Sequence, residues 1–511
     1  MASTAISSPV SPAAVVPRGL SRQALYLMLG FSAGLPFYMF STVLTLRLQA
    51  HEIGLVVIGF FAWVQLLPTF KFLWAPLLDR YQVPGFCRFW GKRRGWIMLA
   101  QLGIFTSMAA MAFVSPGDSL ALTALFAVLL AFWTTTLEVA ADAWRIELAP
   151  TQEEQGPVAA ANLWGYRTAM VAAGSGALLV ADQPAWGWTG AYLAIATVAF
   201  LPFPLLVGMR PDPGRQGSRA AALAAGLGAS LVILPALAIA TAAIGWLLLE
   251  SASGMGMGDQ TNVTPYVLGL CMVPFLIMAA AVPKIRHLPP SSPARRSVAI
   301  GPYVDFFWRY GFMALALMAF VSIYRMGDVL ALNLSKPMIR DLGYSLSEIG
   351  RADSYVALLA SMTGVALGGW MAARWRQTWA LAAGAFFAAI GNFGFVWLAH
   401  QPPAEATLYI ATAMDQFGNG MAGTIFVVYL SLLVDPRHPG AQYAFLSGFA
   451  FLLPRLLSGS GGAMVESFEA AGYNGFDLFF LLSGIVSLAA ILFLPLIGRA
   501  RPRARDDEAQ A

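Results

Sequence analysis

Long apolar runs alternate with short polar loops from one end of the chain to the other. A helix of about 20 apolar residues crosses the hydrocarbon core of a bilayer, and these runs reach or approach that length. We therefore predict fourteen membrane-spanning helices. The predicted spans are 24–47, 54–78, 95–115, 119–149, 158–182, 188–209, 221–249, 264–283, 306–335, 346–372, 377–398, 406–434, 440–465 and 475–498.

The composition agrees with this pattern. Of the 511 residues, 58% are hydrophobic and only 11% are charged, and the mean hydropathy is +0.67. Soluble domains carry roughly 25% charged residues, so a soluble fold of this length would need far more polar surface. The sequence therefore predicts an all-α membrane protein.

The basic residues lie mainly in every second loop. If the N-terminus is cytoplasmic, the inside loops hold nearly all loop arginines and lysines, including the GKRR run at Gly91–Arg94. The opposite loops hold only Arg47, Lys336 and Arg340. Basic loops stay on the cytoplasmic side, so we expect both termini to be cytoplasmic. This placement also explains the net charge of +5, which therefore does not indicate nucleic-acid binding.

Two blocks of six predicted helices flank a central segment with Pro/Arg-rich ends. Six plus six is the parallel-repeat plan of major facilitator transporters. We predict a major facilitator fold of two six-helix bundles plus two inserted helices that pack peripherally. The predicted segments are a disordered tail at 1–23, the N-terminal bundle at 24–210, the linker with its two helices at 211–300, the C-terminal bundle at 301–498 and a cytoplasmic tail at 499–511.

Several charges fall inside predicted spans of the first block. Glu138, Asp142 and Arg145 share one face of the fourth span, because their spacings are four and three residues. Arg167 is predicted at a similar depth on the fifth span, close to Asp142 and Arg145. A charge at the bilayer centre costs about 2.5–3.5 kcal/mol, so such residues indicate a polar pathway or a paired cluster. A proton- or substrate-coupled network and a static salt-bridge cluster are both compatible with the pattern.

The second block carries a comparable set of polar residues. Arg325 and Asp328 share one helix face, and the remaining members follow on later spans. These further residues are Asp353, Asn392, Asp415, Gln416 and Arg455. We predict that they contribute to substrate binding or to the charge network.

Patterns typical of enzymes or pumps are missing from the sequence. Lys92 in GKRR lacks the Ser or Thr of a phosphate-binding loop, so ATP-driven transport by this chain is not expected. The two cysteines and four scattered histidines give no metal-ligand spacing or disulfide framework. We expect no metal, no cofactor and no enzymatic activity.

Several motifs resemble those of AmpG-type muropeptide permeases, a branch of the major facilitator superfamily related to acetyl-CoA transporters. The resemblance runs from about Gly30 to Gly498. The matching motifs are GLP at Gly34–Pro36, KFLWAPLLDR at Lys71–Arg80, GKRRGW at Gly91–Trp96, DAWRIEL at Asp142–Leu148, GYR at Gly165–Arg167 and YRMGD at Tyr324–Asp328.

The resemblance implies proton-driven import of GlcNAc-anhydroMurNAc peptides across the bacterial inner membrane. Such substrates carry carboxylates, which buried arginines bind through charge-assisted hydrogen bonds. A monomer in the lipid bilayer with a small-molecule muropeptide substrate is expected. The predicted roles are proton coupling for Glu138 and Asp142, anion binding or breakable charge pairs for Arg145, Arg167, Arg325 and Arg455, and a cytoplasmic gate for Lys71, Asp79 and Arg80.

The sequence departs from the family pattern in a longer loop between Arg80 and Gly91 and at three groups of residues. Leu137–Glu138 stands where Gln-Asp is usual, Ser354 replaces an embedded lysine, and Asp415–Gln416 replaces Glu-Asn. These changes leave the cargo open. A carrier of another bulky anion, such as a CoA ester, is the alternative within transporters, and a non-transporting sensor or scaffold is the alternative outside them.

Overall fold

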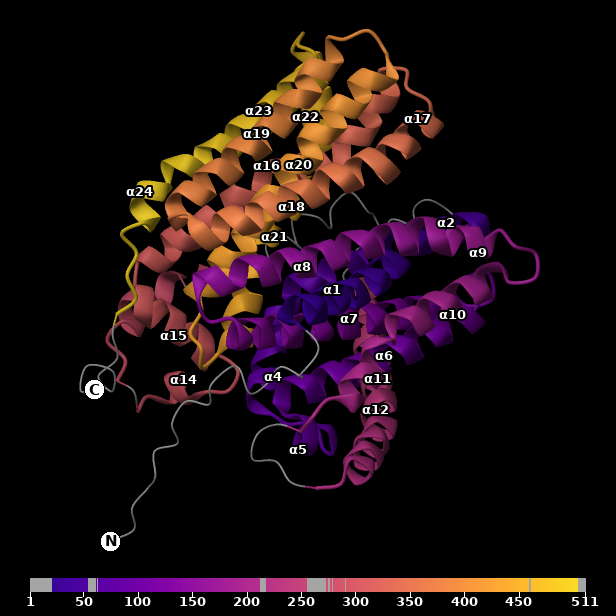
Figure 1. Ribbon diagram of the computed structural model, residues 1–511, viewed down its shortest axis with the longest axis vertical. Helices are drawn as coiled ribbons and strands as arrows, with labels where there is room; N and C mark the ends of the chain where they lie inside the picture. The colour runs from indigo at the N-terminus through magenta and orange to yellow at the C-terminus, as the bar shows by residue number, and fades with distance from the viewer. Residues whose placement is uncertain are drawn as a thin grey trace.

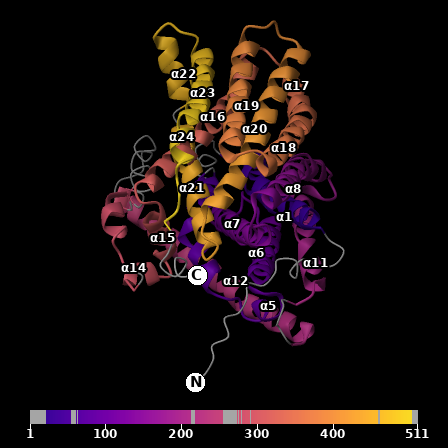
Figure 2. The same ribbon diagram turned by 60° about the vertical axis from the view of Figure 1, so that its left-hand side comes forward.

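A computed structural model describes residues 21–53, 61, 63–211, 217–254, 273, 276–277, 279–289, 291–458 and 461–503. All regular structure in these ranges is helical, as predicted. The helices form two halves that lie against each other, with the N-terminal half in indigo to magenta and the C-terminal half in orange to yellow (Figures 1 and 2).

The N-terminal half begins at Ser21, whose side chain caps the first helix. Its second span is a 3₁₀ segment that contains Pro68, and proline removes a backbone donor from a helix interior. Its elements are α1 (Arg22–Tyr38), η2 (Met39–Val43), α2 (Leu44–Ala50), η3 (Trp63–Leu73), α4 (Ala75–Arg80), α5 (Phe86–Trp90), α6 (Lys92–Phe113), α7 (Leu120–Leu148), α8 (Gln152–Val171), η4 (Ala172–Gly176), α9 (Ala177–Ala181), α10 (Gly187–Ala199) and α11 (Pro202–Gly208).

The C-terminal half follows the same plan of long helices joined by short turns. Within it, α20 packs mainly against α18 and α19, and α16 packs against α21 and α23. Its elements are α14 (Pro293–Arg296), α15 (Gly301–Tyr310), α16 (Met313–Asp341), α17 (Leu346–Arg351), η6 (Ala352–Val356), α18 (Ala357–Arg374), α19 (Gln377–Ala399), α20 (Glu405–Leu433), α21 (Pro439–Ser458), α22 (Gly461–Ala470), α23 (Gly475–Leu492) and α24 (Leu494–Ile497).

Ten helices of the described residues are long and apolar enough to cross a membrane. The first predicted inserted helix corresponds to α12 (Arg219–Gly254), which packs peripherally against α5, α6 and α7. Only 6% of its most apolar 18-residue stretch is buried, and Leu231 and Trp246 are largely exposed. Most of the second predicted inserted helix, 264–283, lies outside the described residues, as do 1–20, 54–60 and 504–511.

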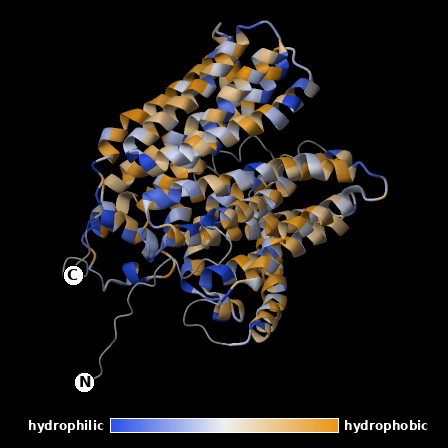
Figure 3. Cartoon of the chain, viewed as in Figure 1, coloured by the Kyte–Doolittle hydropathy of each residue, from blue (hydrophilic) through white to orange (hydrophobic). Residues whose placement is uncertain are grey.

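Hydrophobic residues are common along the long helices, as expected for helices that cross a bilayer (Figure 3). The halves meet along a seam to which each contributes long helices. From the N-terminal half, α8 packs against α18 and α20. From the C-terminal half, α21 packs against η3, α4 and α7. The two halves diverge towards one end of the seam, where α2 and α9 belong to the N-terminal half and α17 belongs to the C-terminal half (Figure 1).

Candidate functional site

One end of the seam is closed by direct hydrogen bonds between the halves. We call it the closed end, defined by the end of α4, the start of α8, the end of α18 and the start of α21. At the start of α8, the Gln152 amide donates to the carbonyls of Ala372 and Trp375, each at 2.7 Å. The Tyr303 hydroxyl donates to the Phe72 carbonyl across the same end.

Asp79 is the central acid of the closed end. Its Oδ2 accepts a hydrogen bond from the backbone N–H of Ala441 at 2.8 Å, in the first turn of α21. Unpaired N–H groups and the helix dipole make a helix N-terminus favourable for an anion. A Cβ at Gly440 would lie 2.9 Å from Asp79 Oδ1, so this approach requires glycine or a shift of the carboxylate.

Arg93 holds Asp79 in place from within the N-terminal half. Its guanidinium lies 2.8 Å from Asp79 Oδ1 and 2.7 Å from Glu147 Oε1. Lys92 adds a hydrogen bond from Nζ to the Asp79 carbonyl at 2.6 Å. Sequence reasoning placed Arg93 in the basic loop that contains the GKRRGW motif, but it did not assign Arg93 to the gate.

The other two predicted gate residues occupy different surroundings. Arg80 is exposed and makes no ion pair or side-chain hydrogen bond within the described part of the chain. Lys71 lies deeper, where its Nζ is 3.9 Å from Glu138 Oε2. Of the three predicted gate residues, Asp79 is therefore the one with a described hydrogen bond to the opposite half.

Above the closed end, α7 carries a paired charge cluster. Asp142 Oδ1 accepts from Arg145 Nη2 at 3.1 Å, and Arg145 is completely buried. Arg145 also donates to Gln155 Oε1 at 2.7 Å and to Ser431 Oγ, on the C-terminal half, at 2.9 Å. The predicted Asp142–Arg145 pair is therefore present, and one of its members reaches across the seam.

Tyr443 of α21 links this cluster to the opposite half. Its ring lies 5.4 Å from the Arg145 guanidinium carbon and 5.9 Å from Lys71 Nζ. Both distances allow a cation–π interaction, which strengthens where water is excluded. Protonation of Glu138 or Asp142 would therefore change the charge balance around a ring that belongs to the other half.

Arg167 lies away from Asp142 and Arg145, which is a correction to the predicted grouping. Its only described side-chain hydrogen bond runs to Met170 Sδ at 3.7 Å. The reason is the start of α8, which begins at Gln152 rather than near Pro157. Gln155 reaches Arg145, and Arg167 lies twelve residues later, or about 18 Å further along the helix.

Arg167 instead lines a small cavity between the halves. The cavity has a volume of about 140 Å³, and Arg325 of α16 lines it too. Asn419, Tyr443, Ser447 and Phe451 supply other parts of its wall. One arginine thus comes from each half. Sequence reasoning missed Tyr443, Ser447 and Phe451, whose four-residue spacing places them on one face of α21.

The second set of predicted charges partly joins this cavity. Arg325 donates to Asp328 Oδ2 at 2.8 Å, as their shared face predicted. Arg455 donates across the seam to Thr69 Oγ1 at 2.9 Å and to the Gln65 carbonyl at 3.1 Å. The guanidinium carbons of Arg325 and Arg455 both lie 5.4 Å from the Phe451 ring.

The remaining predicted residues are less directly connected to the cavity. Asp415 accepts from the neighbouring Gln416 amide at 2.8 Å and lies within electrostatic range of Arg167. Asn392 is buried between α19 and α23, where it donates to the Ala388 carbonyl and Ser487 Oγ. Asp353 is 44% exposed in the π-turn η6 and pairs with Lys336 at 2.5 Å.

No group of three or more potential metal-ligating side chains occurs among the described residues. The described site therefore consists of paired charges and hydrogen bonds along the seam between the two halves.

Comparisons with known proteins agree with this architecture. The anhydromuropeptide permease of Escherichia coli (strain K12) is 27% identical over 473 residues, covering 92% of this chain and 79% of its own length. A putative AmpG 4 transporter of Rickettsia conorii is 25% identical over 467 residues, covering 91% of this chain and 95% of its own. No family model matches the chain.

Solved structures with this fold are major facilitator proteins. The proton:xylose symporter XylE, bound to 6-bromo-6-deoxy-D-glucose, has a TM-score of 0.59 at 14% identity, covering 94% of this chain and 95% of its own. The human organic anion transporter MFSD10 has a TM-score of 0.53 at 15% identity, covering 93% and 99%. The chain therefore has the fold of the major facilitator proteins. Over about nine tenths of its length, the chain is similar in sequence to the anhydromuropeptide permease and to the putative AmpG transporter.

Proposed function

We propose that this permease imports anhydromuropeptides, GlcNAc-anhydroMurNAc peptides, across the bacterial inner membrane in symport with protons. The observation that carries the proposal is the pair of arginines in the central cavity, Arg167 from one half and Arg325 from the other. A peptide carboxylate between them would accept charge-assisted hydrogen bonds from both halves. The name of the Escherichia coli relative supports this choice of cargo.

The cavity size supports a mechanism in which the halves move. At about 140 Å³ it is smaller than the roughly 300–1,000 Å³ of ordinary ligand sites. A muropeptide therefore requires the halves to separate around Arg167 and Arg325. Closure at one end and divergence at the other are consistent with alternating access, in which two bundles rock about a central site.

Proton coupling in this proposal belongs to Glu138 and Asp142. They lie one turn apart on α7 and are balanced by Lys71 and Arg145. A proton on Asp142 would weaken its pair with Arg145 and free that guanidinium, which also holds Ser431 across the seam. Protonation would thus bias the same contacts that close the transporter.

The topology of the proposal has fourteen spans in a monomer, with both termini cytoplasmic. The basic residues Arg88, Lys92 and Arg93 are grouped near the closed end, which the positive-inside rule assigns to the cytoplasm. The closed end is then the cytoplasmic gate, and the described conformation is closed towards the cytoplasm.

The proposal is tested by uptake of labelled anhydromuropeptide into proteoliposomes with and without an inward proton gradient. We expect accumulation with the gradient and only equilibration without it. A CoA ester serves as competitor, because it is the other bulky anion under consideration. Uptake of a labelled CoA ester combined with no muropeptide uptake would identify the CoA ester as the cargo. No movement of either solute would favour a sensor or scaffold.

A further inference from the structure

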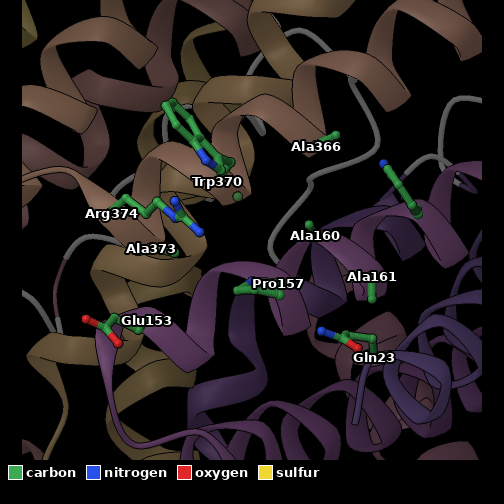
Figure 4. A pocket seen from close by; sticks show the side chains of 11 residues that line it. Gln23, Glu153, Pro157, Ala160, Ala161, Ala366, Trp370, Ala373 and Arg374 are labelled. Carbon is green, nitrogen blue, oxygen red and sulfur yellow. The ribbon is translucent and has the colours of Figure 1, made fainter. Parts of the chain in front are cut away.

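A second cavity lies on the side of the seam, away from the two central arginines. We call it the seam groove, defined by Pro157, Ala160 and Trp164 of α8 with Gly369, Trp370 and Arg374 of α18. Its volume is about 830 Å³. Figure 4 shows the α8 residues on one wall and the α18 residues on the other, so each half contributes one wall.

The seam groove is amphipathic along its length. Its polar residues, Gln23, Glu153 and Arg374, come from the ends of α1, α8 and α18 that lie at the closed end. Its deeper wall is formed by small apolar residues such as Ala161 and Ala366. Ala366 lies eight residues before Arg374, which places it about 12 Å deeper in the membrane. A polar mouth above an apolar slot fits a molecule with one charged and one hydrocarbon end.

The mouth lies at the level of the lipid headgroups. Trp370, Trp375 and Trp379 are 47%, 41% and 65% exposed at this end of α18 and the start of α19. Exposed tryptophans gather where the hydrocarbon core meets the headgroups. The default occupant of a lateral groove at this depth is therefore a membrane lipid rather than water or a soluble ligand.

The two charges at the mouth differ in sign. Arg374 and Glu153 are both exposed, and neither forms an ion pair with the other or with any other side chain that the structure describes. In Figure 4 both lie at the same end of the groove, with Ala373 nearby. A headgroup with a phosphate and an ammonium complements one arginine and one glutamate. A primary ammonium fits better than a quaternary one, because it donates hydrogen bonds to a carboxylate.

We propose that the seam groove binds one phospholipid with a primary-amine headgroup. Its phosphate contacts Arg374, its ammonium contacts Glu153, and an acyl chain lies beside Trp164 and Trp370. Because the walls belong to different halves, a bound lipid interacts with both only while the closed end is shut. A ligand that binds one conformation better shifts the population towards it, so the lipid stabilises closure. This last step rests on the proposed alternating-access function.

Lipid binding is tested by native mass spectrometry of the full chain purified in detergent, with phosphatidylethanolamine, phosphatidylcholine or phosphatidylglycerol added. Wild type should retain phosphatidylethanolamine best. Arg374→Gln should weaken retention of all three roughly tenfold or more, as expected for loss of a charge-assisted hydrogen bond. Glu153→Gln should keep the phospholipid but lose the preference for the primary amine. Arg376→Gln, which changes an exposed arginine outside the groove, is the matched control.

Equal retention of the three lipids by wild type, or unchanged retention by Arg374→Gln, would overturn the proposal. Retention does not depend on transport. A chain that binds the lipid as described but imports no muropeptide would contradict only the proposed function. A chain that imports muropeptide with no lipid preference would contradict only the lipid site.

Discussion

Arg145 connects the proposed proton site to the opposite half through a single guanidinium. It is completely buried and donates to Asp142, Gln155 and Ser431. Removing one partner of a buried charge pair costs roughly 3–5 kcal/mol, because the other charge is left uncompensated. Neutralising Asp142 by a proton is a reversible version of that loss. The protonation state of one carboxylate can therefore change the stability of a contact between the halves.

Asp142→Asn should abolish accumulation of anhydromuropeptide against a gradient while leaving exchange of labelled for unlabelled substrate. The amide keeps the size of the side chain but carries no proton for transport. Uptake and counterflow in proteoliposomes measure the two activities. Asp118→Asn, an exposed residue in the loop before α7, is the control and should behave as wild type. Full accumulation by Asp142→Asn would move proton coupling to another residue.

Arg167→Gln should raise the KM for anhydromuropeptide about tenfold to a hundredfold, since a hydrogen bond to a charged group contributes roughly 1.5–3 kcal/mol. Initial uptake rates over a range of substrate concentrations give this value. Arg340→Gln, at the exposed end of α16, is the control. An unchanged KM for Arg167→Gln would show that the cavity arginines do not bind the cargo.

At this scale the sequence predicted pairs within one helix better than contacts between helices. Asp142–Arg145 and Arg325–Asp328 followed from a three-residue spacing. The position of Arg167 depended on where α8 begins, and a shift of five residues in that boundary changes its depth by about 7.5 Å. The partnership of Arg93 with Asp79 depends on how α6 packs beside α4, which no local pattern encodes.

Among the elements, α21 makes the most varied contacts with the opposite half. In its first turn, the Ala441 N–H donates to Asp79. The Tyr443 ring contacts Lys71 and Arg145. Arg455 donates to Thr69 of η3. These positions extend from the closed end past the cavity. A displacement of α21 would therefore alter the gate and the cavity together.

Gly440→Ala should loosen the closed end, because the added Cβ would crowd the Asp79 carboxylate at 2.9 Å. Opening of the closed end is measured through Ser447→Cys, which places a thiol on the cavity wall. In inside-out vesicles, a membrane-impermeant maleimide should label that cysteine faster when Gly440→Ala is also present. The chain without Ser447→Cys corrects for Cys87 and Cys271. Equal labelling rates would mean that this contact does not keep the gate shut.

The long, strongly apolar helices were predicted well from periodicity and length, and α12 was placed peripherally because it lacks ionisable residues through its span. The π-turns η2, η4 and η6 were not predicted. Such a turn inserts one residue without a hydropathy signal, because its stability comes from the neighbouring helices. The seam groove was not predicted either, because its two walls lie more than 200 residues apart in sequence.

For the whole molecule, the basic loops predict that the C-terminus is cytoplasmic. A green fluorescent protein fused after residue 511 should fluoresce, and alkaline phosphatase fused at the same place should be inactive. The two reporters fold in opposite compartments, so each controls for the other. An active phosphatase with no fluorescence would invert the topology and place the Asp79 gate on the outer side.

Proton movement coupled to cargo is the central claim for the whole molecule. Proteoliposomes loaded with a pH-sensitive dye, with no gradient imposed and the membrane potential clamped, are given anhydromuropeptide from outside. The account predicts internal acidification that needs both the substrate and wild-type Asp142. Muropeptide entry without acidification would contradict it.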